Sequence, residues 1–483
     1  MDLFQIGMFL LVAGYYTYGK LIETILGPDD RPTPAKTSAD GVDFVILPHW
    51  KNMLIQLLNI AGIGPVIGVI LGIKFGPIVF LLIPLGNIFG GAVHDFVGAM
   101  MSMRAGGANL PSLIKTNLGR PIYAVFGIFM ALLLILVVAV FINVPANLIN
   151  DLLPKADWFW TVVAVIFLYY IVATLFPIDQ IIGRFYPIFG FMLLAGTVAI
   201  FFALMLRHAE APASFMVIND GFRAGMLKQP IIPCLFVTIA CGILSGFHAT
   251  QSPIVVRAME TERNARATFY GMMVVEGGIA MIWAAAAMAI YTLKPETMAL
   301  GGATVLGQIT ELFLGKGLGT VTVLAVVVLA ITSGDTAMRS LRLSLAEAFH
   351  LDQKPIFNRL ILCAPLIVII GAILLWSNKD AESFAILWNY FAWGNQVLAA
   401  FTLLAGSVWL FSRQKNCWIT LVPGAFMTFV VITYILWTQK ERGGPIGFGL
   451  PLTTSYEIAG AITLALVGAT LLRARFLRRK NVP

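Results

Sequence analysis

The sequence is poor in charged residues. Asp, Glu, Lys and Arg make up only 12% of its 483 residues, whereas soluble proteins contain about 25%. Hydrophobic residues make up 59%, and the mean hydropathy is +0.88. Segments with alternating apolar and polar residues are missing, which argues against an outer-membrane barrel. These features exclude a soluble domain and predict an all-α polytopic membrane protein that is in contact with membrane lipid.

The sequence also lacks the patterns that mark common intramembrane enzymes. It has no HExxH motif and no GxSxG motif with catalytic partners. Its four cysteines have no metal-ligand spacing and are expected to be small buried residues: Cys234, Cys241, Cys363 and Cys417. We therefore expect no enzyme activity and no cofactor, apart from a Na⁺ ion if transport is coupled to one. The net charge of +8 reflects loop charge in a membrane protein and does not indicate nucleic acid.

Long apolar segments bounded by charged or turn residues predict about thirteen transmembrane helices. A short amphipathic helix is expected near Asn109–Leu118. Asp2 precedes the first apolar segment and no Lys or Arg does, so we expect this span to be retained. The predicted spans are Leu3–Leu26, Met53–Ile73, Phe75–Met103, Pro121–Leu148, Trp158–Phe176, Pro187–Leu206, Pro230–Val256, Ala267–Leu293, Leu318–Ser340, Phe357–Trp376, Phe384–Phe411, Trp418–Trp437 and Thr454–Leu472.

Loop charge predicts the orientation. Most Lys and Arg residues fall on the loops that share a side with the basic C-terminal tail. The positive-inside rule then places the C-terminus in the cytoplasm of a cell with this protein in its inner membrane. With an odd number of spans, the N-terminus lies outside.

Two of the predicted spans are interrupted by helix-breaking residues. The interruptions contain Gly62, Gly64, Pro65 and Gly68 in the first span, and Gly242, Gly246 and Pro253 in the second. Such breaks are tolerated inside a membrane only where protein or a water-filled cavity satisfies the freed backbone groups. A pair of broken helices, one in each half of a chain, indicates a transporter site. We expect Gly62 and Gly246 to lie where helical hydrogen bonding lapses and to face each other across a central cavity.

The order of the spans predicts an inverted repeat. Without the first span and the last two, ten remain, and they divide into Met53–Leu206 and Pro230–Phe411. Each half has five spans and opens with its broken helix, and an odd number makes the halves enter from opposite sides. The predicted division is 1–50 for an additional helix and polar linker, 51–207 and 208–412 for the repeats, and 413–483 for two further helices with a basic tail.

The second break carries the residues most suited to substrate. His248 can bind a carboxylate or carry a proton, because an ionisable group in a membrane is costly and is commonly functional. The alternative is a neutral His bonded to a freed carbonyl. Ser245 and Thr250 suit substrate binding or helix capping equally. A site between two half-helix ends favours a carboxylate together with a cation.

Other intramembrane polar residues are candidates for ion coupling. Thr332, Ser333 and Asp335 supply oxygen atoms suited to Na⁺, and Asp335 alone could carry a proton; the alternative is a polar contact near the helix end. His94, Asp95 and Glu276 are either proton carriers or links between helices.

The stretches NIAGIGPVIG, FGGAVHDFVGAMMSMRAGG and TIACGILSGFHATQSP, and more weakly TSGDTAMRS, resemble the carbon starvation A family of peptide and pyruvate transporters. This resemblance implies membership of the amino-acid–polyamine–organocation superfamily, with a leucine-transporter-like core of two inverted five-helix repeats. It implies that Ala61–Pro65 and Gly242–His248 hold substrate, and that a Na⁺ ion would lie near Ala61, Thr332 and Ser333. The expected substrate-site residues are Asn59, Ala61, Gly62, Gly64, Gly242, Ser245, Gly246, His248 and Thr250.

Together, these features predict a secondary active transporter that imports small peptides or a small carboxylate such as pyruvate. Coupling to H⁺ or Na⁺ and alternating access between two bundles are expected. An uncoupled channel or a membrane sensor subunit is the alternative.

Overall fold

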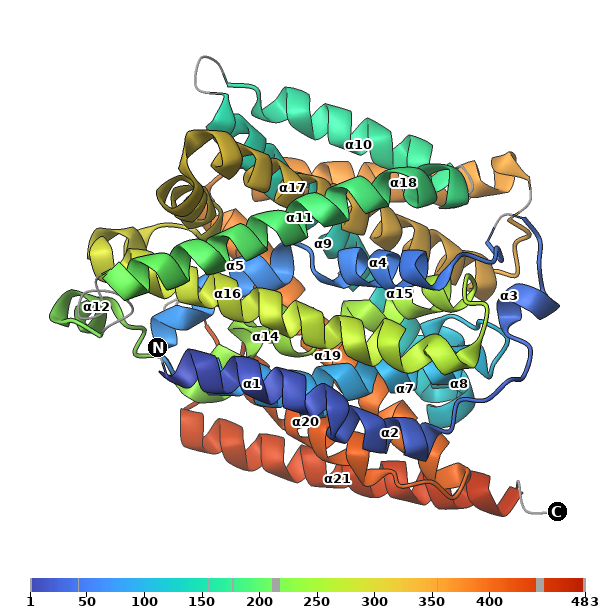
Figure 1. Ribbon diagram of the computed structural model, residues 1–483. Coiled ribbons are helices and arrows are strands. Elements are labelled where there is room, and N and C mark those ends of the chain that lie inside the picture. The colour runs from blue at the N-terminus through green and yellow to red at the C-terminus, as the bar shows by residue number, and fades with distance from the viewer. Residues whose placement is uncertain are drawn as a thin grey trace.

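The computed structural model describes residues 2–41, 43–153, 157–175, 178–210, 218–353, 355–439 and 447–480. The regular elements of these residues are helices, with no strand among them. Nine described helices are long and apolar enough to cross a membrane, and a bent pair of helices forms a tenth such span. The structure is therefore a bundle of helices suited to a membrane, as the low charge and high hydropathy of the sequence predict (Figure 1).

The first half of the chain contains eleven α-helices within the described residues. A 3-10 turn, Ile73–Phe75, follows α5, and a π-helical turn, Asn87–Gly91, joins α6 to α7. The α-helices are α1 (Asp2–Tyr16), α2 (Tyr18–Leu26), α3 (Pro34–Thr37), α4 (His49–Ile60), α5 (Ile63–Gly72), α6 (Val79–Gly86), α7 (Ala92–Met103), α8 (Leu110–Leu118), α9 (Arg120–Leu152), α10 (Phe159–Leu175) and α11 (Ile178–Glu210).

The second half of the chain likewise consists of α-helices with short 3-10 and π-helical turns between them. Short 3-10 and π-helical turns lie at Ile231–Leu235, Glu262–Asn264, Arg266–Gly271 and Pro295–Ala299. The α-helices are α12 (Asp220–Gly225), α13 (Phe236–Thr238), α14 (Ala240–Ile243), α15 (Gly246–Val256), α16 (Met272–Leu293), α17 (Gly302–Ala348), α18 (Ile356–Ser377), α19 (Ala381–Ser412), α20 (Trp418–Trp437) and α21 (Leu452–Lys480).

Each of the thirteen predicted spans coincides with a helix or a group of consecutive helices, and the expected amphipathic helix is α8. The largest difference is α17, which extends far beyond Leu318–Ser340 in both directions. Gly315 interrupts this helix with φ of 73°, a conformation that glycine adopts without steric cost. The residues before Gly315 therefore form a separate helical arm, which the hydropathy pattern did not indicate.

The broken helices lie inside the bundle. In Figure 1, α4, α5, α14, α15 and α16 occupy the middle, with α10 and α18 along one edge and α21 along the other. α5 packs against α14, α16 and α17, while α15 packs against α7 and α19. The additional helix α1 covers α6 and α16, and α20 and α21 cover α19. This layout surrounds both breaks with protein, as the missing backbone hydrogen bonds require.

Candidate functional site

The first break separates α4 from α5 at Ala61 and Gly62. Gly62 has an extended backbone with φ of −75° and ψ of −152°, and the two helices are bent by 44°. Pro65 lies in the first turn of α5, where an N–H would have no helical acceptor. The Gly and Pro residues of the sequence thus end one half-helix and start the next.

The second break separates α14 from α15 at Leu244 and Ser245. Both residues are extended, with φ and ψ of −173° and 116° at Leu244 and −129° and 126° at Ser245. The expectation that helical hydrogen bonding lapses at both positions is confirmed. Gly242 lies within α14, and Gly246 is the first residue of α15.

The polar groups freed by the second break are bound by α19. The amide nitrogen of Phe247 donates to Oδ1 of Asn395 at 3.1 Å, and the Ser245 hydroxyl donates to the same oxygen at 3.4 Å. Nε2 of Gln396 donates to the Leu244 carbonyl at 2.8 Å. Asn395 thereby caps α15, and Gln396 binds the unwound segment. The sequence analysis missed both residues, although an adjacent Asn and Gln in the middle of an apolar span is a detectable signal.

Four titratable side chains form a buried cluster next to the second break. Nδ1 of His94 lies 2.8 Å from Oδ1 of Asp95, and Nδ1 of His248 lies 3.1 Å from Oδ2 of the same carboxyl group. Nε2 of His248 lies 3.9 Å from Oε1 of Glu276. All four residues are at most 2% exposed. We call these residues, His94, Asp95, His248 and Glu276, the carboxylate–histidine cluster.

In this cluster, one carboxyl group contacts both imidazole rings. An ionised Asp95 that accepts from both rings would put a proton on each Nδ1 and leave each Nε2 as an acceptor; a role in proton coupling stays a prediction. Neither oxygen of Glu276 has a hydrogen-bond partner among the described residues. Glu276 and His248 come from α16 and α15, so movement between these helices changes their separation. The sequence named these four residues individually, but it did not show that one carboxylate joins α7 to α15.

At the first break, α17 supplies hydroxyl groups. Oγ of Ser333 lies 3.4 Å from the carbonyl oxygens of Leu58 and Asn59. The hydroxyl of Thr336 donates to Oδ1 of Asn59 at 3.1 Å. Carbonyl and hydroxyl oxygens are hard ligands of the kind that alkali cations bind. The expectation that this part of α17 meets the first broken helix is confirmed.

The other two predicted cation residues have different surroundings. The hydroxyl of Thr332 donates to the Leu329 carbonyl of its own helix at 2.9 Å. The carboxylate oxygens of Asp335 are buried and have no hydrogen-bond partner among the described residues, and Arg339 follows one turn later. The described residues contain no group of three or more His, Cys, Asp or Glu side chains arranged to hold a metal ion. A Na⁺ ion at Ala61, Thr332 and Ser333 stays a prediction.

The glycines of the breaks serve close helix packing. A Cβ at Gly62 would lie 3.2 Å from Oγ of Ser333 in α17, and one at Gly246 would lie 2.3 Å from Cβ of Leu398 in α19. A Cβ at Gly64 would lie 2.6 Å from Cβ of Cys241. The expectation that Gly62 and Gly246 face each other across a cavity is therefore wrong, because each faces a different neighbouring helix. Their absent side chains allow the half-helices to approach α17 and α19.

Two remaining predicted substrate residues also make helix contacts. A Cβ at Gly242 would lie 3.1 Å from Cβ of Ala280 in α16. The Thr250 hydroxyl donates to the Phe247 carbonyl at 2.7 Å, and the Thr250 carbonyl accepts from Oγ of Ser340 at 2.9 Å. Whether any of the predicted residues contacts substrate stays a prediction. All of those that carry side chains are buried in this conformation.

The helix arrangement and the two buried breaks define a membrane protein with a leucine-transporter-like fold. Solved structures with the same fold include a manganese transporter of Eremococcus coleocola, with a TM-score of 0.57 and 14% identity over 91% of this chain and 99% of that chain. MhsT in complex with L-phenylalanine matches with a TM-score of 0.55 and 11% identity over 88% of this chain and 99% of that chain. At these identities, the similarity shows the fold alone.

The chain belongs to the carbon starvation protein CstA family, whose model matches residues 1–167, 155–305 and 293–434. An uncharacterized membrane protein of Haemophilus influenzae is 40% identical over 58% of this chain and 89% of that protein. The peptide transporter CstA of Campylobacter jejuni is 27% identical over 56% of this chain and 48% of that protein. The pyruvate/proton symporter BtsT of Escherichia coli is 25% identical over 59% and 48%. The chain thus matches about half the length of these two transporters.

Proposed function

We propose that this protein is a secondary active transporter that imports a small carboxylate such as pyruvate, or small peptides, by alternating access. The observation that carries this proposal is the carboxylate–histidine cluster beside the break between α14 and α15. Two transporters named for peptides and for pyruvate with protons belong to the same family. A buried proton-binding group next to a broken helix is what coupled movement of an anionic substrate and a proton requires.

The substrate carboxylate would bind at the N-terminal end of α15. The first turn of a helix presents N–H groups and a partial positive charge, which together attract anions. The N–H of Phe247 already donates to Asn395. Asn395 would therefore hold the N-terminal end of α15 in place, and the other N–H groups of the first turn would bind the carboxylate. Ser245 and His248 flank Phe247 in the sequence; the Ser245 hydroxyl would have to leave Asn395 to donate to substrate, and His248 would donate through Nε2 when it is protonated.

The coupling ion would be a proton held by Glu276 and His248. Glu276 has no hydrogen-bond partner within the described part of the chain, and Nε2 of His248 is the nearest basic atom, at 3.9 Å. A protonated Glu276 could donate to that nitrogen after a small shift of α16. The second candidate for the coupling ion is Na⁺ bound at Ser333 beside the first break. The carbonyl oxygens of Leu58 and Asn59, each 3.4 Å from Oγ of Ser333, favour it.

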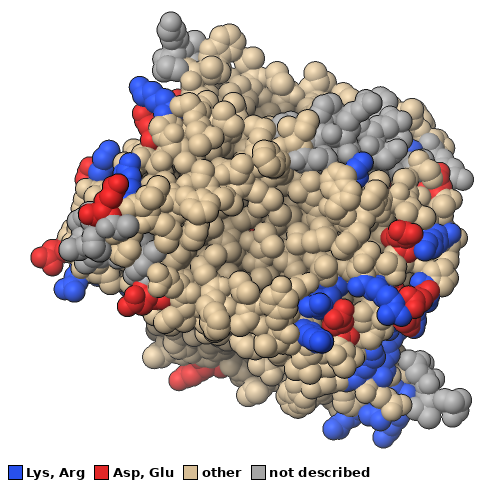
Figure 2. Space-filling model, viewed as in Figure 1, with Lys and Arg blue, Asp and Glu red and all other residues tan. Residues whose placement is uncertain are grey.

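The protein would lie in the inner membrane with its C-terminus in the cytoplasm. Lys and Arg side chains gather at the end of the molecule where α21 terminates (Figure 2). The positive-inside rule assigns such an end to the cytoplasm. The polar linker between α2 and α4, the helix α8 and the end of α21 would then all face the cytoplasm.

Uptake by the purified protein in liposomes tests the function. Radiolabelled pyruvate, a dipeptide and a tripeptide are offered separately under an inward proton gradient, an inward Na⁺ gradient or neither. We expect one solute class to accumulate above its external concentration under the proton gradient, and to leave again when a protonophore is added. Glu276→Gln, which has the same shape but cannot ionise, should retain binding and lose accumulation.

Three results would contradict parts of this proposal. Equilibration without accumulation under either gradient would indicate an uncoupled channel. Absence of both binding and flux for all three solutes, in protein that remains folded, would favour a sensor or another substrate class. Accumulation driven by Na⁺ alone, with Glu276→Gln fully active, would transfer the coupling role to the site at Ser333.

A further inference from the structure

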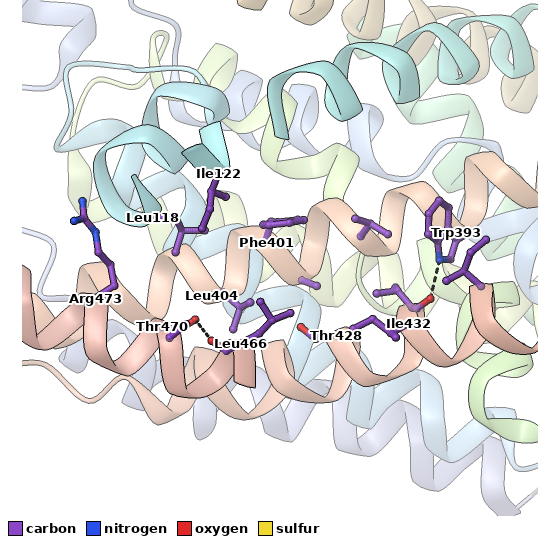
Figure 3. A pocket seen from close by; sticks show the side chains of 15 residues that line it. Leu118, Ile122, Trp393, Phe401, Leu404, Thr428, Ile432, Leu466, Thr470 and Arg473 are labelled. Atoms are coloured by element: carbon purple, nitrogen blue, oxygen red, sulfur yellow. Dashed lines mark hydrogen bonds between the residues drawn. The ribbon is translucent and has the colours of Figure 1, made fainter. Parts of the chain in front are cut away.

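An apolar groove lies between α19 and the two helices that follow it in the chain. It has a volume of about 410 Å³ and runs between α19, α20 and α21, with the junction of α8 and α9 at one end (Figure 3). Phe401, Leu404, Ile432 and Leu466 contribute much of its apolar wall. The described lining contains no Asp or Glu. A groove of this composition suits a hydrocarbon chain better than a polar solute.

The uncharged polar groups of the groove are already bound by the protein. Nε1 of Trp393 donates to the Val431 carbonyl at 2.9 Å. The hydroxyls of Thr428 and Thr470 each donate to a carbonyl of their own helix at 2.7 Å. These side chains therefore need no hydrogen bond from an occupant, and the interior of the groove can accept methylene groups without leaving a polar group unpaired.

The length of the groove matches one leaflet of a bilayer. Along α19, its lining runs from Trp393 to Leu404. Eleven residues of helix at a rise of 1.5 Å span about 16 Å, and half of a ~30 Å hydrocarbon core is about 15 Å. Trp393 lies near the middle of α19, and Leu404 lies toward the end that shares a side with the C-terminus of α21. With the middle of α19 at the membrane midplane, the groove would extend from there toward the membrane surface on the side of the C-terminus of α21.

The surface end of the groove is positively charged. Arg473 lies there, opposite Trp393 (Figure 3), and its Nε donates to the Asn117 carbonyl at 3.1 Å. This hydrogen bond fixes the guanidinium group beside Gly119. A Cβ atom added to Gly119 would lie 3.8 Å from Nη2 of Arg473. The exposed Arg120 follows directly. An apolar channel that ends in a held guanidinium group is complementary to an acyl chain joined to a phosphate.

We propose that this groove is a binding site for one anionic phospholipid of the leaflet that faces the C-terminus of α21. One acyl chain lies between α19, α20 and α21, and the headgroup phosphate pairs with Arg473. The lipid would join α21 and α20 to the α8–α9 junction of the ten-helix core. This inference does not depend on which solute the protein transports.

Native mass spectrometry of delipidated protein tests the site, with phosphatidylglycerol and phosphatidylethanolamine of identical acyl chains as probes. We expect phosphatidylglycerol to bind about fivefold more tightly, since one basic group near the headgroup contributes about that factor. Arg473→Gln should remove the preference, whereas Arg473→Lys should keep most of it. Arg475→Gln is the matched control, because Arg475 is exposed on the same helix and does not line the groove.

A second variant tests the apolar part. Ala469 lines the groove and is exposed, so Ala469→Phe should fill the groove without disturbing the core and should weaken both lipids severalfold. Ala465→Phe, one turn earlier and outside the lining, is its control. Equal binding of the two lipids, equal effects of Arg473→Gln and Arg475→Gln, or full lipid binding by Ala469→Phe would each overturn the proposal. A dimer of the parent that Ala469→Phe dissociates would identify a second copy as the occupant and would also overturn it.

Discussion

The residue scale shows why the polar side chains in these spans are retained. Asp95 accepts hydrogen bonds from two imidazole rings at 2.8 and 3.1 Å, and a buried carboxylate without such partners would be strongly destabilising. The sequence identified each member of the cluster, because isolated polar residues in apolar segments are conspicuous. It could not pair His248 with Asp95, which are 153 positions apart. Pairing depends on how α7 and α15 cross, which hydropathy does not encode.

His248 is where the structure sharpens a prediction made from sequence. If His248 donates to the substrate carboxylate, losing that hydrogen bond to a charged group is expected to cost about 1.5–3 kcal/mol, so His248→Ala should weaken substrate binding roughly tenfold to a hundredfold. His248→Gln keeps a donor for Asp95 but cannot titrate near neutral pH. If protonation matters, His248→Gln should bind substrate while its uptake loses its dependence on pH. Equilibrium binding and uptake measure the two effects. Both are followed from about pH 5.5 to about pH 8.5, which brackets the usual titration range of histidine.

The control for this prediction is His350→Gln, since His350 is exposed at the end of α17. It should leave binding and the pH profile unchanged. A His248→Ala protein that binds and transports like the parent at every pH would make His248 a structural residue, and the assignment of the second break as the substrate site would fail.

At the scale of elements, both breaks were predictable because Gly and Pro interrupt apolar segments in each half of the chain. The backbone angles at Gly62 and Leu244 confirm them. The neighbours of the breaks were not predictable. Gly246 packs on α19 rather than facing Gly62, because its missing side chain makes room for Leu398 and the backbone of Asn395. A glycine pattern states that something approaches closely, but not which helix does so.

The contact between α17 and the first break separates two hydroxyl residues that the sequence treated alike. Ser333 faces the carbonyls of Leu58 and Asn59, whereas Thr332 bonds to its own helix. If Na⁺ binds here, Ser333→Ala removes a ligand, and we expect the Na⁺ concentration for half-maximal uptake to rise about tenfold. Thr332→Ala should shift it much less. Uptake measured against Na⁺ concentration at fixed pH gives both values.

Three outcomes are informative for this pair. A larger shift for Thr332→Ala than for Ser333→Ala would contradict the geometry. Equal dependence on Na⁺ in both variants and the parent would remove Ser333 from the coupling site. Uptake by the parent that ignores Na⁺ would leave the proton and the carboxylate–histidine cluster as the means of coupling.

For the whole molecule, the positions and order of the helices followed from the sequence, because burial in lipid imposes a minimum apolar length on each span; nine described helices and one bent pair meet that length, against about thirteen spans predicted. The leucine-transporter-like fold was implied by the family resemblance and by two halves of five spans. The division into 1–50, 51–207, 208–412 and 413–483 stays a prediction. The polar linker was predicted as a connection only. In the structure it hydrogen-bonds to the residues that follow α15, which composition alone does not reveal.

These hydrogen bonds join the linker and the first turn of α4 to the residues that follow α15. The amide nitrogen of Leu47 and Nδ2 of Asn52 both donate to the Ala258 carbonyl, at 3.0 and 2.9 Å. The Thr33 hydroxyl donates to the Met259 carbonyl at 2.6 Å. Nearby, Nη2 of Arg104 lies 3.0 Å from Oε2 of Glu262, whose side chain is 1% exposed. We expect that opening a path from this side to the second break would separate these contacts.

The last prediction concerns that buried ion pair. Removing one partner of a buried pair leaves the other charge uncompensated and costs about 3 kcal/mol, so Glu262→Gln should weaken the packing of the end of α7 against the turn that follows α15. We expect a cysteine placed at Ser252, which is 1% exposed on α15, to react faster with a water-soluble maleimide in Glu262→Gln than in the parent, with the four native cysteines replaced in both.

Asp30→Asn is the matched control. Arg263 lowers the pKa of the exposed Asp30 carboxyl, so that pair is intact at neutral pH and is lost only as the pH falls through the lowered value. Because water screens both of its charges, breaking the pair should leave the labelling rate unchanged. Identical labelling in the Glu262→Gln protein and the parent would mean that the Arg104–Glu262 ion pair does not control access to α15 from this end.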